Sequence, residues 1–372
     1  MRTLLLLGTV LSVAGCTDYE LNPGNDGSQT GDDDAGRPDD GDDDVVDEDN
    51  PTPGGDTGDP LDDGEGGVMG QICDPSTVDW VSGAEVSIAI DWDGDGVVDE
   101  VLSTLTGSDG SFTLLGVPEG TWTVTIVKGS FSATYEVHVF EGEITEIPEP
   151  VCLEGHDVNI AVVTGEYDDI GAILMEMGLG FDQVEGYTND DYIALLTDLP
   201  TLQTYDMVFL NCGINTSWYD EYATIRDNLE TYLFEGGRIY VSDWSYFFIE
   251  LPIPDAIDFY GTDTTFGSAL DGSPGHLTAD VLDANMQAMV GGTTADLNFN
   301  LNSWALAEAA GVGATVMVEA DAGLYSGGSL PSAKLAIKVE YGSGAAVFTA
   351  FHNEAQATVD MGLLLREIVM TL

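Results

Sequence analysis

The sequence predicts a multidomain chain, with a disordered acidic stalk, a small all-β sandwich and a three-layer α/β domain whose sheet is mostly parallel. Three observations support this prediction. Residues 22–67 are almost wholly Asp, Gly, Pro, Thr and Glu, so they have little to bury. Short alternating runs separated by turn residues follow, which is typical of small β domains. From residue 155, buried apolar runs alternate with helical ones.

Residues 1–15 have the features of an export signal peptide. Arg2 provides a positive charge, a short apolar run follows it, and small residues precede Cys16. The apolar run is too short to span a bilayer. This ending resembles the lipobox of bacterial lipoproteins, which implies that Cys16 carries lipid and becomes the mature N-terminus. A plain secreted protein with an incidental cysteine is the alternative.

The lipoprotein resemblance implies a place in the bacterial cell envelope, held to a membrane through the N-terminal lipid. Thr17 stands where lipoproteins retained at the inner membrane often have aspartate, so we expect the outer membrane. Residues 16–67 then form a linker, because their like charges repel and their composition cannot offset the entropy lost on ordering. A low-affinity brush for divalent cations is the other interpretation of this segment.

The net charge excludes some classes of partner. The chain carries 67 Asp and Glu against 8 Lys and Arg, a formal charge of −59 at pH 7. Nucleic-acid binding requires a basic face, so we expect no nucleic-acid partner. Adhesion to anionic lipid headgroups is disfavoured for the same reason. The sequence leaves a protein or glycan partner unidentified.

Residues 68–153 are predicted to form the β sandwich. The expected strands are 84–92, 98–105, 111–115, 121–128 and 133–140. Cys73 and Cys152 bracket this segment, which suggests that a disulfide joins its two ends. The segment resembles carboxypeptidase regulatory-like modules through Asp109, Gly110, Phe112, Pro118, Gly120, Trp122 and Val124. That resemblance implies a sandwich fold and no peptidase site.

A calcium loop is predicted inside this module. Asp91, Asp93, Asp95 and Asp99 stand at positions 1, 3, 5 and 9 of a nine-residue run, glycine is at position 6, and the Val97 carbonyl adds an oxygen at position 7. The glutamate that an EF-hand has at position 12 is absent, so we expect a weaker, structural calcium site in a hairpin. An acidic turn without metal is the alternative.

Residues 155–372 are predicted to form the α/β domain. Apolar runs predict buried strands at 158–163, 207–210 and 238–241, and helical spacing predicts helices at 170–177 and from Ser217 to Gly236. A terminal hairpin is expected at 334–339 and 345–350, followed by an amphipathic helix at 359–372. The first strand is followed by neither a dinucleotide fingerprint nor a P-loop, so no nucleotide cofactor is expected.

This order of elements resembles the class I glutamine amidotransferase-like fold and its trehalose-utilisation-type relatives. The resemblance is carried by YDMVFLNCG, a helix ending in EGG, RIYVSDWS and YGSGAAVFTAFHNE. Active amidotransferases have a cysteine at the strand-to-helix elbow and a His-x-Glu pair near the C-terminus. His352 and Glu354 match the pair, but Asp243 occupies the elbow. The resemblance therefore implies a catalytically degenerate domain.

Cys212 ends the strand before the elbow strand. We expect it to be a small buried hydrophobe, and to approach His352 only if the strands are aligned differently. The carboxyl ends of the strands are expected to gather six side chains, namely Glu166, Asn211, Asp243, Trp244, His352 and Glu354.

These side chains suggest two kinds of site. They have the chemistry to bind a metal or stack a sugar ring, but we favour a vestigial pocket in which His352 pairs with a carboxylate. The enzyme alternative is a hydrolase of a glycan or amide, in which His352 acts with Asp243 or Glu354 as acid and base.

Overall fold

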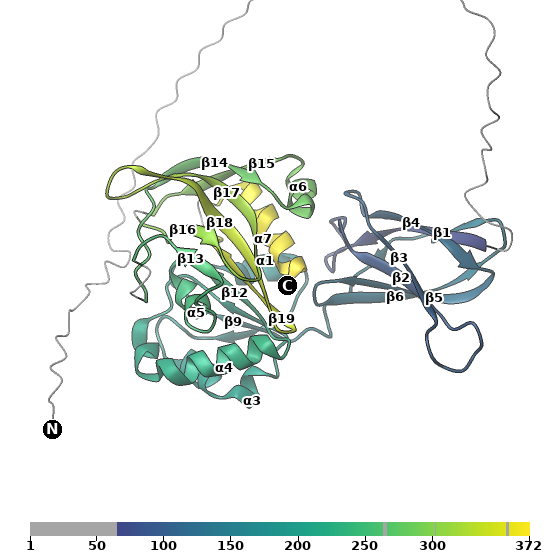
Figure 1. The fold of residues 1–372 in the computed structure, drawn as a ribbon, viewed down its shortest axis with the longest axis horizontal. Coiled ribbons are helices and arrows are strands. Elements are labelled where there is room, and N and C mark those ends of the chain that lie inside the picture. Colours follow the sequence, from purple (N-terminus) through teal and green to yellow (C-terminus); the bar gives the residue numbers. More distant parts are fainter. Residues whose placement is uncertain (1–64, 263–265, 302, 355–356) are drawn as a thin grey trace, which may run out of the picture. The chain divides into compact units, whose positions relative to one another are not determined.

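The computed structural model describes residues 65–262, 266–301, 303–354 and 357–372 (Figure 1). The predicted signal peptide, Cys16 and the linker up to residue 64 lie outside the described residues. Within the described part of the chain, no helix is long and apolar enough to cross a bilayer.

The first described part consists of two four-stranded sheets. One has the order β4-β1-β7, with β8 also paired to β1, and the other has the order β3-β2-β5-β6. The strands are β1 (Glu65–Cys73), β2 (Glu85–Ile90), β3 (Glu100–Leu105), β4 (Ser111–Pro118), β5 (Gly120–Lys128), β6 (Phe131–Val139), β7 (Ile144–Glu146) and β8 (Val151–Cys152). Alternation along β5 buries Val124 and Ile126, whereas Trp122 is partly buried.

The structure explains the presence of Trp122 and Gly110 in the first described part. Trp122 Nε1 donates a hydrogen bond to the Pro118 carbonyl at 2.8 Å, which fixes the turn between β4 and β5. Gly110 has φ +72°, and a Cβ there would lie 2.4 Å from the Ile72 carbonyl oxygen, so only glycine fits. Cys73 of β1 is paired in register with Cys152 of β8, and a disulfide joins them.

The second part is built on one eleven-stranded mixed sheet, whose main path is β10-β9-β11-β12-β19-β18-β17-β14-β15. Pairing is parallel from β10 to β19 and antiparallel beyond it. The prediction of a mostly parallel sheet was therefore wrong, because it did not include the antiparallel strands that extend the sheet past β19. The strands are β9 (Ile160–Val163), β10 (Asp182–Val184), β11 (Met207–Leu210), β12 (Arg238–Ser242), β13 (Ile257–Phe259), β14 (Gly275–Val281), β15 (Thr294–Phe299), β16 (Ala307–Ala310), β17 (Ala314–Gly323), β18 (Ser329–Tyr341) and β19 (Gly344–Thr349).

Helices cover this sheet, with α1 beside α7 and α2 beside α4. They are α1 (Ile170–Glu176), α2 (Asp191–Thr197), α3 (Leu199–Leu202), α4 (Tyr222–Phe234), α5 (Phe247–Glu250), α6 (Ala284–Val290) and α7 (Val359–Thr371), with 3-10 helices η1 (Thr216–Glu221) and η2 (Asp243–Tyr246). The predicted helix start at Ser217 was wrong. Asn215 caps η1 by accepting a hydrogen bond from the Ser217 amide, and α4 begins later.

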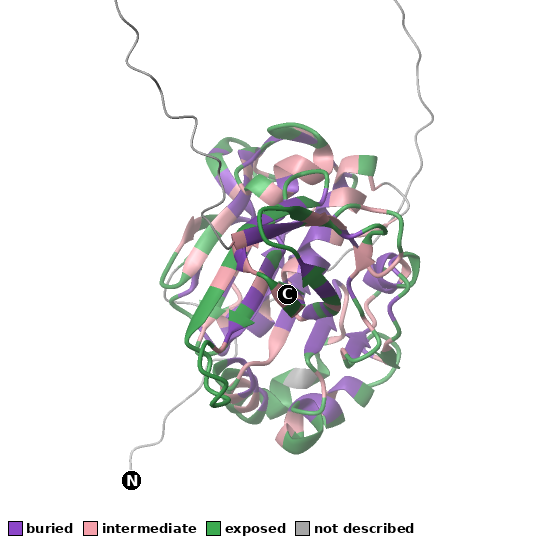
Figure 2. Cartoon of the chain, turned by 90° about the vertical axis from the view of Figure 1, so that its right-hand side faces the viewer, coloured by how far each residue is buried: buried purple, intermediate pink, exposed green. Residues whose placement is uncertain are grey.

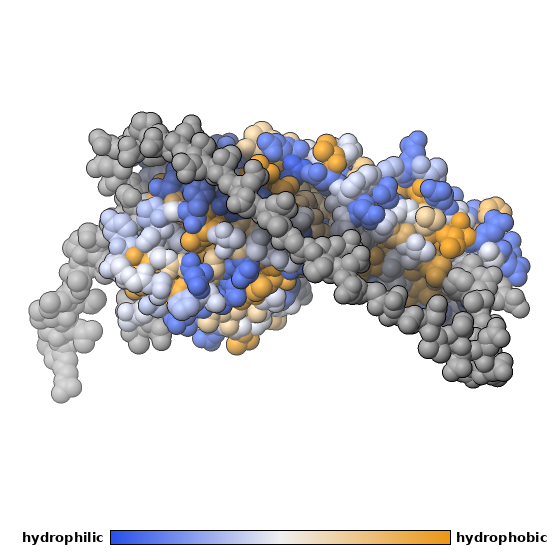
Figure 3. Space-filling view, turned by 90° about the horizontal axis from the view of Figure 1, so that it is seen from above, coloured by the Kyte–Doolittle hydropathy of each residue, from blue (hydrophilic) through white to orange (hydrophobic). Residues whose placement is uncertain are grey.

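Burial follows this layered arrangement. The parallel strands β9, β11 and β19 are buried at every residue, as expected where helices cover both faces (Figure 2). The face seen in Figure 3 has hydrophobic residues interspersed with hydrophilic ones. The antiparallel strands from β13 to β17 were not predicted. Several of them alternate in burial, but many of their buried positions are alanine, which is a weak apolar signal in the sequence.

Candidate functional site

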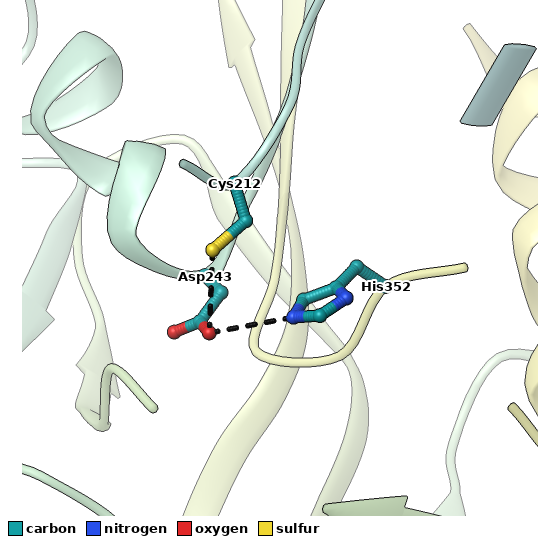
Figure 4. A group of neighbouring side chains, drawn as sticks. All are labelled: Cys212, Asp243 and His352. Atoms are coloured by element: carbon teal, nitrogen blue, oxygen red, sulfur yellow. Dashed lines mark hydrogen bonds and ion pairs between the residues drawn. The ribbon is translucent and has the colours of Figure 1, made fainter. Parts of the chain in front are cut away.

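Three adjacent parallel strands bring three functional side chains to one edge of the sheet. Cys212 follows β11, Asp243 follows β12 directly, and His352 follows β19. Their side chains point toward one another (Figure 4). The Asp243 Oδ2 atom lies 3.6 Å from the Cys212 Sγ atom and 3.5 Å from the His352 Nε2 atom. The expectation that Cys212 approaches His352 only in another strand alignment was therefore wrong.

The turn at Asp243 is strained. Asp243 has φ +47°, in the left-handed region that non-glycine residues rarely adopt. It stands between β12 and η2, so the strand-to-helix turn has the form of a nucleophile elbow. Its Oδ1 atom accepts a hydrogen bond from the Ala305 amide at 2.6 Å. A contact from outside the parallel strands thus holds the carboxylate in place.

A second buried carboxyl group, Asp168, supports the turns around this site. Its Oδ1 atom accepts from the Asn353 amide at 3.0 Å, and its Oδ2 atom accepts from the Ser242 hydroxyl at 2.6 Å. The Ser242 oxygen in turn accepts from the Cys212 amide at 2.9 Å. Asp168 therefore links the turns that carry all three side chains. Asp168 was not predicted as a site residue, although it follows the first strand at the same edge as Glu166.

Burial governs the protonation of this cluster. It raises the pKa of Asp168 to about 6, although His352 and the hydrogen bond from Ser242 oppose the shift. Burial also raises the pKa of Asp243, again opposed by His352. For His352, burial lowers the pKa, but the contact with Asp243 and the nearby carboxylates outweigh it and the net shift is upward. The two carboxyl groups thus resist ionisation, and the pKa of the imidazole lies above its ordinary value.

Two buried polar atoms lack a hydrogen-bond partner among the described residues. They are the Nδ1 atom of His352 and the Oδ1 atom of Asn211. The Oε1 atom of Glu354 lies 3.9 Å from Nδ1, close enough for an ion pair and too far for a hydrogen bond. Glu354 therefore stands behind the imidazole, on the side away from Asp243.

The site is closed to solvent. Asp243 is 0% exposed and His352 is 5% exposed. The cavity beside them has a volume of about 10 Å³, which is room for about one water molecule. It is lined by Asp243, Asn298, Phe299, Asn300, Leu301, Trp304, Phe351, His352 and Met361. Among the described residues, this cavity is too small to hold a substrate beside the imidazole.

The six side chains expected at this edge are divided among three environments. Asp243 and His352 line the small cavity, whereas Glu166, Asn211 and Glu354 line a separate open cleft of about 410 Å³. Trp244 is partly buried against the core, and its ring is 5.9 Å from that of Tyr246. The indole is thus part of an aromatic packing cluster.

The predicted calcium loop lies on the surface between β2 and β3. Carboxylate oxygens of Asp91, Asp93 and Asp95 lie within 4.8 Å of one another. Asp91 accepts hydrogen bonds from the amides of Gly94 and Gly96, the latter at 2.7 Å, and these bonds lower its pKa. Asp99 accepts from the Trp92 amide at 2.8 Å and closes the base of the loop. Carboxylate oxygens are the type of ligand that a hard cation prefers.

A further group of potential metal ligands was not predicted. Glu154, His156 and Asp157 lie close together, but all three are exposed. They are neighbours in the sequence, so their proximity needs no special fold.

The fold of this chain is similar to solved structures of proteins whose sequence identity to it is low. No family model matches the chain, and no curated protein matches it. It is similar to the cytoplasmic protein STM3548 from Salmonella typhimurium, with 13% identity and a TM-score of 0.36 over 68% of this chain and 94% of that one. It is also similar to the cytoplasmic protein STM1381 from Salmonella typhimurium LT2, with 12% identity and a TM-score of 0.37 over 68% of this chain and 96% of that one.

A ThuA-like protein from Parabacteroides merdae is also similar, with 15% identity and a TM-score of 0.35 over 56% of this chain and 87% of that one. TM-scores of this size assign neither an activity nor a substrate to the chain.

Proposed function

We propose that this chain is a lipid-anchored protein of the bacterial cell envelope, with a binding or structural role. In this proposal a β-sandwich module and a catalytically degenerate amidotransferase-like domain stand on an acidic linker. The observation that supports a non-catalytic role is the burial of Asp243 and His352 beside a cavity of about 10 Å³. A hydrolase must admit its substrate to the acid and base, and this site admits about one water.

One observation favours the hydrolase as a second candidate. The positive φ of Asp243 places a carboxylate at an elbow, in contact with His352, where active relatives of this fold hold a nucleophile. Paired carboxyl and imidazole groups are sufficient for acid–base hydrolysis once the site opens.

An activity screen separates the two candidates. The full chain is incubated with sets of glycan and amide substrates, and wild type is compared with His352→Gln and with the matched control His276→Gln, which alters an exposed histidine. We expect no turnover above background in any of the three proteins. Turnover that His352→Gln abolishes and His276→Gln retains would establish the hydrolase.

The lipid anchor is tested by cell fractionation. Replacement of the lipid-bearing thiol in Cys16→Ser is expected to move the protein from the membrane fraction to the soluble fraction, because the chain then loses its acyl groups. Thr17→Ala serves as the control and is expected to stay with the membrane. A wild-type chain found only in the soluble fraction would contradict the anchor.

We also propose that the loop from Asp91 to Asp99 binds calcium and stiffens the β2–β3 hairpin. At a calcium concentration of 100 times Kd, binding stabilises the folded state by about 2.7 kcal/mol. Calorimetry is expected to show a higher melting temperature with calcium than with chelator, and no such difference in Asp93→Asn/Asp95→Asn. The control Asp109→Asn alters another exposed turn and should keep the shift. An unchanged wild-type melting temperature would refute calcium binding.

A further inference from the structure

The closed cluster at the sheet edge presents three types of metal-binding atom. The Sγ atom of Cys212, a carboxylate oxygen of Asp243 and a ring nitrogen of His352 all lie within 4.8 Å of one another, and all three residues are buried. Figure 4 shows these side chains converging from three strand ends. Thiolate and imidazole together favour zinc and related d-block ions over calcium or magnesium.

We propose that Cys212, Asp243 and His352 bind a divalent d-block cation, with zinc as the reference ion. This site goes beyond the envelope function proposed above and does not depend on it. Its role is structural, because the ion joins the ends of β11, β12 and β19 at a place that solvent does not reach.

The distances between the ligand atoms fit such an ion. Zinc bonds of about 2.0–2.3 Å in tetrahedral geometry place the ligand atoms about 3.3–3.6 Å apart. The Asp243 Oδ2 atom lies 3.6 Å from Cys212 Sγ and 3.5 Å from His352 Nε2. A directly bonded imidazolium–carboxylate pair is shorter, at about 2.7–2.9 Å. The 3.6 Å contact between Cys212 and Asp243 is also that of a thiol hydrogen bond, so both spacings are compatible with a shared ion and with direct contact, and the metal test below separates them.

The surroundings orient two of the three ligands. The Ala305 amide holds the Oδ1 atom of Asp243, which leaves Oδ2 directed at the thiol and the imidazole. On the other side of the ring, the buried Nδ1 atom of His352 has no hydrogen-bond partner within the part of the chain that the structure describes, and Glu354 lies 3.9 Å from it. A carboxylate behind a ligating histidine is the usual second partner in metal sites, and a small approach of Glu354 completes that hydrogen bond.

The charge and space around the cluster also suit a cation. Asp168, Asp243 and Glu354 surround a single imidazole, and neither Lys nor Arg is among the groups that shift the pKa of Asp243. The cavity of about 10 Å³ beside Asp243 and His352 has room for one water, which completes four-coordination. Because sulfur binds the ion as a thiolate, the Cys212 thiol loses its proton to the water that enters with the ion when the site opens.

Metal content and the spectrum of a cobalt form test this site on the full chain. The protein is stripped with chelator, loaded with Zn²⁺ or Co²⁺ and dialysed. We expect one tightly held equivalent per chain and a thiolate-to-cobalt charge-transfer band that excess Ca²⁺ does not remove. Cys212→Ser should lose the band, and both Cys212→Ser and His352→Gln should retain at least tenfold less metal.

Two matched controls alter the exposed clusters. Asp91→Asn/Asp93→Asn/Asp95→Asn removes the acidic loop, and His156→Gln removes the exposed histidine cluster. Both are expected to keep the band and the tightly held equivalent. A folded wild-type chain without the band, or Cys212→Ser with wild-type metal content, would overturn the proposal. Because the band is measured on the wild type, a variant that fails to fold does not decide the result.

Discussion

At the scale of single residues, the most informative side chains are buried carboxyl groups. Asp168 and Asp243 lie in the interior, where the charged form of a carboxyl group is costly, and each is held by backbone amides. Asp168 connects the turns after β9, β12 and β19 through Asn353 and Ser242. It therefore maintains the edge of the sheet on which Cys212 and His352 lie.

The raised pKa of Asp168 predicts a specific pH dependence. Its folded pKa of about 6 lies above the unfolded value of 3.8, so its contribution to stability is fully present below pH 3.8 and is lost as the pH rises through 6. The shift corresponds to about 3 kcal/mol.

We expect Asp168→Asn to flatten the fall in the free energy of unfolding between pH 4 and pH 7, because the amide does not ionise. Urea denaturation at several pH values measures this. The control Asp169→Asn changes the neighbouring residue and should keep the wild-type slope. The same slope in Asp168→Asn as in wild type would contradict the assignment.

Only some of the residues of the candidate site could be predicted from the sequence. Asp243 and His352 were found because both follow strands with a distinctive ending. Cys212 was assigned to packing, since a thiol at the end of an apolar run does not reveal which neighbouring strand it faces. Asp168 was missed because the burial of a carboxyl group depends on loops that are distant in the sequence, including the one that carries Asn353.

At the scale of elements, the sequence pattern predicted the positions of strands and helices well where one face of the element is buried along its length. The strands from β2 to β6 and the helix α7 lie within a few residues of their expected positions, because alternation and helical spacing follow directly from burial. The antiparallel strands from β13 to β17 were not anticipated. One of the contacts near them, from the Ala305 amide to Asp243, belongs to the candidate site.

The ion pair between β5 and α7 provides a test of element packing. Lys128 Nζ lies 2.8 Å from Glu367 Oε1, and the two side chains are 6% and 2% exposed. Burial raises the pKa of Glu367, so removal of its partner leaves a costly buried carboxylate. We expect Lys128→Met to lower the free energy of unfolding by about 3–5 kcal/mol, measured by urea denaturation.

The double variant Lys128→Met/Glu367→Leu should recover most of that loss, since no buried charge remains. Lys334→Met removes the more exposed partner of Glu319 and should cost about 1 kcal/mol or less. Equal losses in Lys128→Met and Lys334→Met would contradict the role of burial.

At the scale of the whole molecule, the dominant property is the charge of −59. Acidic residues outnumber basic ones so strongly that most carboxylates have no ion-pair partner available. Their mutual repulsion opposes compaction and acts across distances comparable to the Debye length. Salt in the surroundings is therefore part of what keeps the folded domains stable.

We accordingly expect the melting temperature of the full chain to rise when NaCl is increased from 0.05 to 1 M, because the Debye length falls from more than about 10 Å to about 3 Å. KCl should give the same rise, which separates screening from specific binding of sodium. A melting temperature that stays constant or falls with added salt would show that repulsion does not limit stability.

The closure of the cavity beside Asp243 and His352 has a consequence for time scales. Trp304 and Phe351 are each only 1% exposed, and both line that cavity. We therefore expect an occupant of this cavity to exchange when these two side chains move aside. Its residence time then depends on how often this part of the structure opens locally, and not on its affinity alone.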